Sequence, residues 1–450
     1  MSHGYVPEAA IPVPSVPDVV EEGPPSPEAL KHTGLSEEFV TDLILKLLYT
    51  QGARSGAAIA ESVRLPFPLI DDLLLTLQQR RMVEVLRTQG PTRPGYVFDL
   101  AGEGRTRGRD ALEASQYVGP APVPLQQYRQ WVEAFSIQRA RVDKSELRRG
   151  FNWLVLDEHT LDQIGPAINS AKSLFLYGHP GNGKTASAET IAKLLGGDIY
   201  VPYAIEVDGQ VIVVYDPIYH ELVPDDRPGP GEDVIATQPP HDMRFAHVLR
   251  PVVLTGGELT LDLLDLRYDP FAKMYQAPFQ VKANGGVLIV DDFGRQRVPA
   301  RDLLNRWIVP LEKRIDFLSL HTGGKFPVPF DCLLILATNL RPEDLVDEAF
   351  MRRIHYKIHV HSPTRAQFEE IFMRATEERG LKYERRAVEQ LFTEYYETGL
   401  AAPRGCHPRD ILDHVFDFAR YLGKPPALSS ELLSLAARSY FIDSTAEGGQ

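Results

Sequence analysis

One eight-residue run limits the fold of this 450-residue chain more than any other segment, because glycines stand at its first, fourth and sixth positions and lysine and threonine close it. Mainly apolar residues 173–177 precede the run, and helix-forming residues 186–195 follow it. This order predicts a strand, a tight turn and a helix, with backbone N–H groups turned inward where the helix dipole favours negative charge. We therefore expect a phosphate-binding loop, formed by Gly178, His179, Pro180, Gly181, Asn182, Gly183, Lys184 and Thr185 and continued by Ala186.

Two side chains at the end of this run predict the ligand. A lysine at the position of Lys184 reaches the β- and γ-phosphates of a nucleotide, and the hydroxyl group of Thr185 is suited to bind Mg²⁺. The sequence therefore predicts ATP and Mg²⁺ as cofactors.

Polar residues follow two further strand-like runs. The apolar run 287–290 ends in Asp291 and Asp292, and the run 333–337 is followed by Asn339. In parallel sheets the strand tips meet ligands, so we expect Asp291 to bind Mg²⁺ and Asp292 to act as the general base for an attacking water. Asn339 is expected to hold the same water or a phosphate oxygen.

Composition excludes several classes of protein. About 43% of the residues are hydrophobic and 24% charged, and no apolar run approaches the ~20 residues of a membrane-spanning helix. The N-terminus has no basic cluster followed by an apolar core, so we expect a cytoplasmic protein without membrane insertion. Cys332 and Cys406 do not suggest a disulfide framework. The net charge of -13 disfavours non-specific binding to nucleic acids.

Changes in pattern along the chain predict its domains. Prolines dominate the first segment, helical and strand-like runs alternate in the central part, and the last part is helical. The expected regions are a flexible tail (1–34), an N-terminal domain (35–118), a linker (119–144), an α/β domain (145–361), a helical domain (362–441) and a second tail (442–450).

The N-terminal domain resembles a winged-helix module. Three helical runs precede two short strand-like runs, 82–86 and 96–100, which a Gly- and Pro-rich turn joins. Acidic and basic residues nearly balance, and Asp71 and Asp72 stand near the start of the candidate recognition helix. Phosphates would repel these carboxylates, so we favour docking to a protein, while DNA binding stays open because the wing and the last helix carry arginines.

Taken together, the phosphate loop, the acidic strand end, the polar end of run 333–337 and the helical domain resemble the AAA+ ATPase family over roughly residues 145–440. The resemblance implies a homo-oligomeric ring, expected to be a hexamer, and a sensor role for Asn339. It implies an arginine finger, given to the neighbouring subunit, at Arg353 or Arg352, of which Arg353 directly precedes the apolar start of the last strand. It also implies a lid arginine at Arg409, with Arg404 as the less favoured position.

Two glycine pairs refine this resemblance. Gly285 and Gly286 precede the acidic strand, and Gly323 and Gly324 form the turn of a hairpin before run 333–337. Such features resemble the branch with a pre-sensor-1 hairpin, which includes MoxR-like ATPases, enhancer-binding activators and unfoldases. Most relatives carry Glu at the position of Asp292; the shorter side chain reduces the reach of the base, which leaves both fast and slow hydrolysis open. The resemblance assigns no role to the long insertion near 200–280.

The favoured hypothesis is a ring-forming ATPase that remodels proteins, with the winged-helix domain recruiting a protein client or adaptor. A DNA-associated regulator that uses ATP as an assembly switch is the alternative. A third hypothesis, suggested by Asp292, is an ATP-binding scaffold that hardly turns over.

Overall fold

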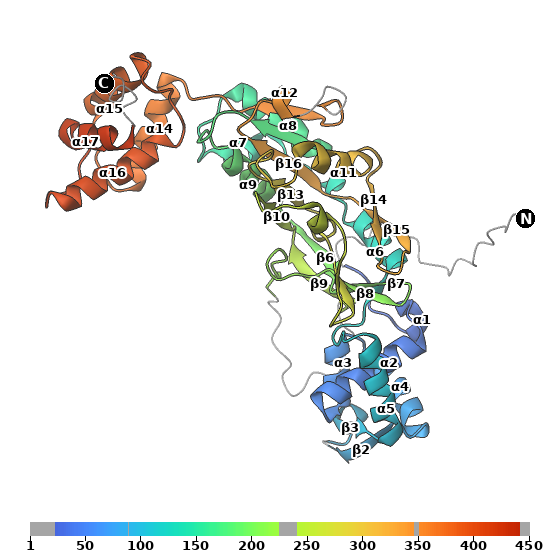
Figure 1. Cartoon of the computed structure of the whole chain (residues 1–450). Coiled ribbons are helices and arrows are strands. Elements are labelled where there is room, and N and C mark those ends of the chain that lie inside the picture. Colours follow the sequence, from blue (N-terminus) through green and yellow to red (C-terminus); the bar gives the residue numbers. More distant parts are fainter. Residues whose placement is uncertain (1–22, 89, 225–240, 346–350, 442–450) are drawn as a thin grey trace, which may run out of the picture.

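The computed structural model describes residues 23–88, 90–224, 241–345 and 351–441. Figure 1 shows four regions along the molecule: the N-terminal helices at one end, a lobe of short strands, a central sheet, and the C-terminal helices at the other end. No helix within the described ranges is both long enough and apolar enough to cross a bilayer. The expected tails at 1–22 and 442–450 lie outside these ranges.

The central region is a five-stranded parallel sheet covered by helices on both faces. Alternate side chains of its strands point to opposite faces, so each face has its own buried apolar core. This is the α/β fold of the P-loop NTPases that the sequence predicts. The strands lie in the order β10 (Val252–Thr255), β13 (Val287–Val290), β16 (Leu333–Thr338), β5 (Leu174–Tyr177) and β17 (Tyr356–His359).

Different helices cover the two faces. Three of them share a core with one face: α7 (Lys144–Phe151), α8 (Glu158–Ser170) and α9 (Lys184–Leu194). On the other face, α11 (Ala300–Lys313) buries Trp307 completely against the sheet. Short elements complete the region: η4 (Leu261–Leu264), α10 (Phe279–Lys282) and α12 (Pro342–Leu345).

A second lobe, rich in strands, contains most of the insertion near 200–280 together with segments before and after it. It has a five-stranded mixed sheet, two antiparallel strand pairs and an apolar core of its own. The mixed sheet has the order β11 (Arg267–Asp269), β12 (Met274–Gln276), β8 (Gln210–Val213), β7 (Ala204–Val207) and β4 (Val123–Pro124). The pairs are β6 (Asp198–Pro202) with β9 (Phe245–Leu249), and β14 (Ile315–Ser319) with β15 (Lys325–Pro329).

The predicted linker at 119–144 is wrong, because residues 123–135 belong to the second lobe, whereas Ile137 and Val142 join a core of the central sheet. Strand β4 pairs with β7, and helix α6 (Leu125–Ala134) buries Tyr128, whose hydroxyl oxygen accepts a hydrogen bond from Asn284 Nδ2 at 2.7 Å. The prolines suggested a linker, but they flank a short strand and an amphipathic helix. A short η3 (Ile137–Arg139) leads on to α7.

The predicted tail at 1–34 is also wrong where the structure describes it. Helix α1 (Leu30–Thr33) lies in this segment, and the carbonyl oxygen of Pro24 accepts a hydrogen bond from Asp242 N at 2.6 Å. Arg244, 1% exposed, donates to the carbonyl oxygen of Thr33 at 2.9 Å while its guanidinium pairs with Asp242. The arm is therefore held by residues some 200 positions away, which local composition does not reveal.

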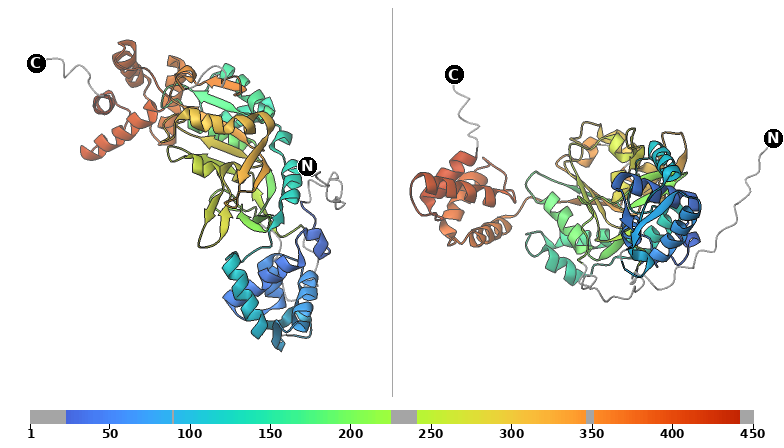
Figure 2. Two further views of the ribbon diagram at one scale, coloured as in Figure 1. Left: turned by 45° about the vertical axis from the view of Figure 1, so that its right-hand side comes forward. Right: turned by 90° about the horizontal axis from the view of Figure 1, so that it is seen from below.

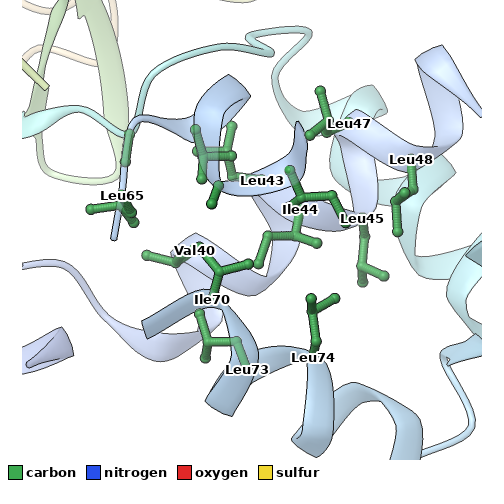
Figure 3. Close-up of a cluster of buried hydrophobic side chains, with 14 of the residues drawn as sticks. Val40, Leu43, Ile44, Leu45, Leu47, Leu48, Leu65, Ile70, Leu73 and Leu74 are labelled. Atoms are coloured by element: carbon green, nitrogen blue, oxygen red, sulfur yellow. The ribbon is translucent and has the colours of Figure 1, made fainter. Parts of the chain in front are cut away.

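The N-terminal region has helices around a small antiparallel sheet of order β1-β3-β2. Ser36 caps α2 by accepting a hydrogen bond from Phe39 N. Figure 3 shows the apolar core, in which Val40 and Ile44 face Ile70 and Leu74. The elements are α2 (Glu37–Gln51), β1 (Arg54–Ser55), α3 (Gly56–Val63), α4 (Phe67–Gln79), β2 (Val83–Thr88), η2 (Arg93–Gly95), β3 (Tyr96–Leu100) and α5 (Gly102–Ala114).

The C-terminal helices form a separate group, which the segment after β17 joins to the sheet (Figure 2). We call this group the lid. It buries its own aromatic cluster around Phe368, Phe392 and Tyr396. The lid consists of α14 (Arg365–Glu378), α15 (Arg385–Phe392), the π-helix Thr393–Glu397, α16 (His407–Tyr421) and α17 (Ser430–Tyr440).

Candidate active site

The glycine-rich run forms the turn between β5 and α9, at the carboxyl end of the sheet. Gly178, Gly181 and Gly183 have φ values of 147°, 78° and 86°, which disfavour residues with a side chain. A Cβ atom on Gly178 would lie 2.4 Å from the carbonyl oxygen of Val360, and one on Gly181 would lie 2.3 Å from Cys406 Sγ. The loop therefore packs against both the last strand and the lid, and only glycine fits.

Lys184 begins helix α9, and its ammonium group lies in the curve of the loop. Nζ donates to the carbonyl oxygens of Gly178 (3.0 Å) and His179 (2.9 Å) and to Asn339 Oδ1 (2.5 Å). Burial lowers the pKa of Lys184, and the negative charges of Asp291 and Asp292 oppose that shift. The ammonium group is thus held where an anionic ligand could replace the carbonyl oxygens.

The carboxylates of the two aspartates after β13 form hydrogen bonds with other polar side chains at the carboxyl ends of the strands. Thr185 Oγ1 donates to Asp291, 3.0 and 2.9 Å from its two carboxylate oxygens. Asp292 Oδ1 accepts a hydrogen bond from Asn339 Nδ2 at 2.9 Å. The structure therefore brings Lys184, Thr185, Asp291, Asp292 and Asn339 together, as expected for parallel strands whose carboxyl ends share one edge.

This chemistry also suits the predicted cofactors. A hydroxyl oxygen beside a carboxylate is a donor set that Mg²⁺ accepts together with phosphate oxygens and water. The loop adds an ammonium group and the N-terminal end of α9, both of which favour phosphate. The side chains present therefore fit a magnesium-bound nucleotide.

A cavity of about 450 Å³ extends from these residues to the lid. Arg409 lines it and lies 3.6 Å from Glu378, measured between Nη2 and Oε2. Arg404 lies near Gly181, and its charge contributes to lowering the pKa of Lys184. Pro180, Asn182 and Ala186 also line the cavity, whereas His179 contributes its carbonyl oxygen to Lys184.

Part of the cavity wall is formed by residues that the sequence motifs do not predict. Trp153, Leu154 and Val155 come from the segment between α7 and α8, and Arg374 and Cys406 come from the lid. No motif marks these positions. Gly181 indicates that some other group approaches the loop closely, because a side chain at this position would leave no room for it. In the structure that group is Cys406.

The two candidate finger arginines lie at the amino ends of the strands, opposite the phosphate loop. Ser173, which precedes β5, donates to the carbonyl oxygen of Arg353 at 3.3 Å, and Arg353 Nε lies 2.6 Å from Glu312 Oε1. A second cavity of about 630 Å³ lies here. Its lining includes Lys172, Glu312, Arg314, Arg352, Arg353 and His355. Within one chain, neither Arg352 nor Arg353 joins the cavity at the phosphate loop.

Comparisons with known proteins give limited overlap. A family described as a domain of unknown function (DUF8689) matches residues 364–439, and no curated protein matches the chain. A solved structure of a RuvB mutant from Thermotoga maritima is similar over 68% of this chain and 74% of that chain, at 13% identity and a TM-score of 0.37. NtrX from Brucella abortus in complex with ADP is similar over 64% of this chain and 56% of that chain, at 16% identity and a TM-score of 0.37. Function must therefore be argued from the chain's own geometry.

Proposed function

We propose that this chain binds ATP with Mg²⁺ at the phosphate loop and hydrolyses it, as a member of the AAA+ type of ATPase. One observation carries the proposal: Lys184, Thr185, Asp291, Asp292 and Asn339 form a continuous hydrogen-bonded group beside a nucleotide-sized cavity, with Asp292 N donating to Asp291 Oδ1. Each residue type fits a separate task in phosphoryl transfer.

The proposed roles follow from the contacts. Lys184 exchanges its carbonyl partners for phosphate oxygens, which a buried ammonium group binds more strongly than an exposed one does. Thr185 and Asp291 would hold Mg²⁺, which supplies positive charge against the phosphates. Asp292 accepts a proton from the attacking water, and Asn339 orients the carboxylate of Asp292.

The test compares two lysines of helix α9. Lys184→Ala removes the ammonium group from the loop, whereas Lys193→Ala changes an exposed residue near the other end of the helix. We expect steady-state phosphate release to fall by about 10²-fold or more in Lys184→Ala and to stay unchanged in Lys193→Ala. Equal rates in the wild type and Lys184→Ala would end the enzyme proposal. Absence of ATP binding in the wild type would end the nucleotide proposal as well.

Ring assembly is the second part of the proposal. Arg353 lies at the amino edge of the sheet, away from its own phosphate loop, so it would have to act on the nucleotide of a neighbouring copy. A hexamer is the assembly that the resemblance implies, and the β14–β15 hairpin is consistent with the MoxR-like branch. Sedimentation with ATP and magnesium would measure the number of copies.

We further propose that the N-terminal region recruits a protein client or adaptor, as a winged-helix domain. The outward face of α4 presents Pro68, Asp72, Leu75 and Gln79, a mixed apolar and acidic surface without a cation. Asp71, beside this face, pairs with Arg93 at 2.6 Å. Duplex DNA carries dense negative charge and would not be attracted to this face.

The DNA-associated regulator has one supporting observation, since Arg80, Arg81 and Arg87 are exposed at the end of α4 and on β2. Binding to duplex DNA that weakens steeply with salt would favour the regulator over the protein-recruiting machine. No binding at low salt would remove it.

A further inference from the structure

The turn that carries the acidic pair has an unusual backbone. Asp292 has a φ of 46°, in the left-handed region that residues with a side chain rarely adopt, and Gly294 follows with a φ of 95°. A left-handed residue other than glycine costs roughly 1 kcal/mol, so surrounding contacts must hold it. The direction of the Asp292 carboxylate toward Asn339 depends on this conformation.

On one side, a carbonyl oxygen and a side-chain hydroxyl group of β16 hold the turn. Phe293 N donates to the carbonyl oxygen of Ala337 at 2.7 Å, and Thr338 Oγ1 donates to the carbonyl oxygen of Phe293 at 2.6 Å. These bonds tie the turn to the strand that ends at Asn339. Within the turn, Arg295 N donates to the carbonyl oxygen of Asp292 at 3.0 Å. None of these bonds reaches the carbonyl oxygen of Asp291.

The side chain of Gln296 makes that connection. It is 9% exposed, its Oε1 accepts a hydrogen bond from Gly294 N at 2.8 Å, and its Nε2 donates to the carbonyl oxygens of Asp291 (3.1 Å), Asp292 (3.3 Å) and Gly256 (3.3 Å). Only the NH₂ end of the amide can donate to carbonyl oxygens, and its two N–H groups are shared among these three, which fixes the orientation of the amide. One amide thus joins the ends of β10 and β13.

We infer that Gln296 is a positioning residue for the hydrolysis reaction: it sets the peptide planes of Asp291 and Asp292 and thereby the direction of the Asp292 carboxylate. The inference rests on the proposed function. Gln296 does not line the cavity, but two of its hydrogen bonds go to Asp291 and Asp292, which do. Its loss should therefore slow the chemical step while nucleotide binding stays close to normal.

The experiment replaces Gln296 by Met, which keeps the length of the side chain and removes both polar ends. Gln280→Met is the control, because Gln280 is also buried and its Nε2 donates to the carbonyl oxygen of Leu264 and to Asp316, but it lies before the amino end of β13. We expect kcat to fall by roughly 10-fold or more in Gln296→Met, with the Kd of a fluorescent ATP analogue changed less than about 3-fold. Gln280→Met should keep kcat per folded molecule.

A second variant covers the case in which Gln296→Met does not fold. Gln296→Glu keeps the size and the acceptor for Gly294 N, but its carboxylate faces three carbonyl oxygens without a donor. It should show the same loss of kcat without a matching change in Kd. In an Asp292→Asn background, either Gln296 change should lower the residual rate much less, because the residue it positions is already lost.

The outcomes separate the two proposals. If the wild type binds ATP but releases no phosphate, the proposed hydrolysis fails, whatever Gln296 does. If the wild type is active and Gln296→Met keeps the wild-type kcat, the inference about Gln296 is overturned. An equal loss of kcat in Gln280→Met, or a full further loss in the Asp292→Asn background, also overturns it, because both would indicate general destabilisation.

Discussion

The two ends of the central sheet differ in how their polar groups are used. At the carboxyl ends, Lys184 Nζ donates to Asn339 and Thr185 Oγ1 donates to Asp291 beside a cavity, in contacts that a ligand can replace. At the amino ends, Asp331 is 6% exposed and its carboxylate is saturated by Ser136, Ile137 and Arg314. The same apolar strands therefore carry two kinds of polar network. We call the carboxyl side the replaceable end, because a ligand can take over its contacts, and the amino side the permanent end, because its carboxylate is fully bonded within the protein.

Arg353 is an exception to this comparison, because it is a candidate catalytic residue that lies at the amino ends of the strands. We expect Arg353→Ala to keep ATP binding and to lower turnover by about 10³-fold, the effect of losing an arginine that stabilises transition-state charge. Arg352→Ala is the matched control, since the neighbouring arginine lines the same second cavity. Phosphate release and binding of a fluorescent ATP analogue measure the two quantities.

The activity of a mixture of two inactive variants tests whether Arg353 acts on the nucleotide of another copy. Lys184→Ala carries an intact Arg353, and Arg353→Ala carries an intact phosphate loop, so a mixture of the two inactive variants should regain part of the activity. No recovery in the mixture, or normal turnover in Arg353→Ala alone, would contradict the assignment.

The permanent network at the amino ends should matter for stability rather than turnover. Asp331→Ala leaves the Ser136 hydroxyl, the Ile137 N–H and the Arg314 guanidinium without their buried acceptor. We expect the free energy of unfolding to fall by about 3 kcal/mol, with kcat per folded molecule nearly unchanged. Urea unfolding measures the loss, and Asp417→Ala, at an exposed site on α16, should change it by less than about 0.5 kcal/mol. A large drop in kcat with normal stability would contradict the comparison.

The replaceable end could be predicted from sequence because its signals are local. The glycine spacing, the apolar run before Asp291 and the run before Asn339 each describe a strand and the residues at its tip, and parallel pairing then brings the tips together. The helical lid was predicted for the same reason, from periodic apolar residues. Which lid residues face the loop was not, because that depends on how two separate cores pack.

The second lobe and the N-terminal arm escaped prediction because their contacts are distant. Arg244 reads as an ordinary surface cation, yet it is buried among groups from Thr33, Pro122 and Gln127. Strand β4 has two residues, too few for a periodic signal, and becomes a strand by pairing with β7. Gln296 lies in a loop and belongs to no motif, so its role emerges only from its contacts.

The smallest predicted effect is on the pH dependence of stability. It concerns His407, which lies in the lid at the start of α16. Burial lowers the pKa of His407 to about 4, from an ordinary value of 6.5. Below 6.5 the unfolded chain takes up a proton that the folded lid refuses, so stability falls as pH drops from 6.5 toward 4. At pH 5 the expected loss is about 2 kcal/mol, and His407→Gln should remove this part of the pH dependence. Urea unfolding of both proteins at pH 7 and pH 5 tests it, and equal pH dependence of the two proteins would contradict this role of His407.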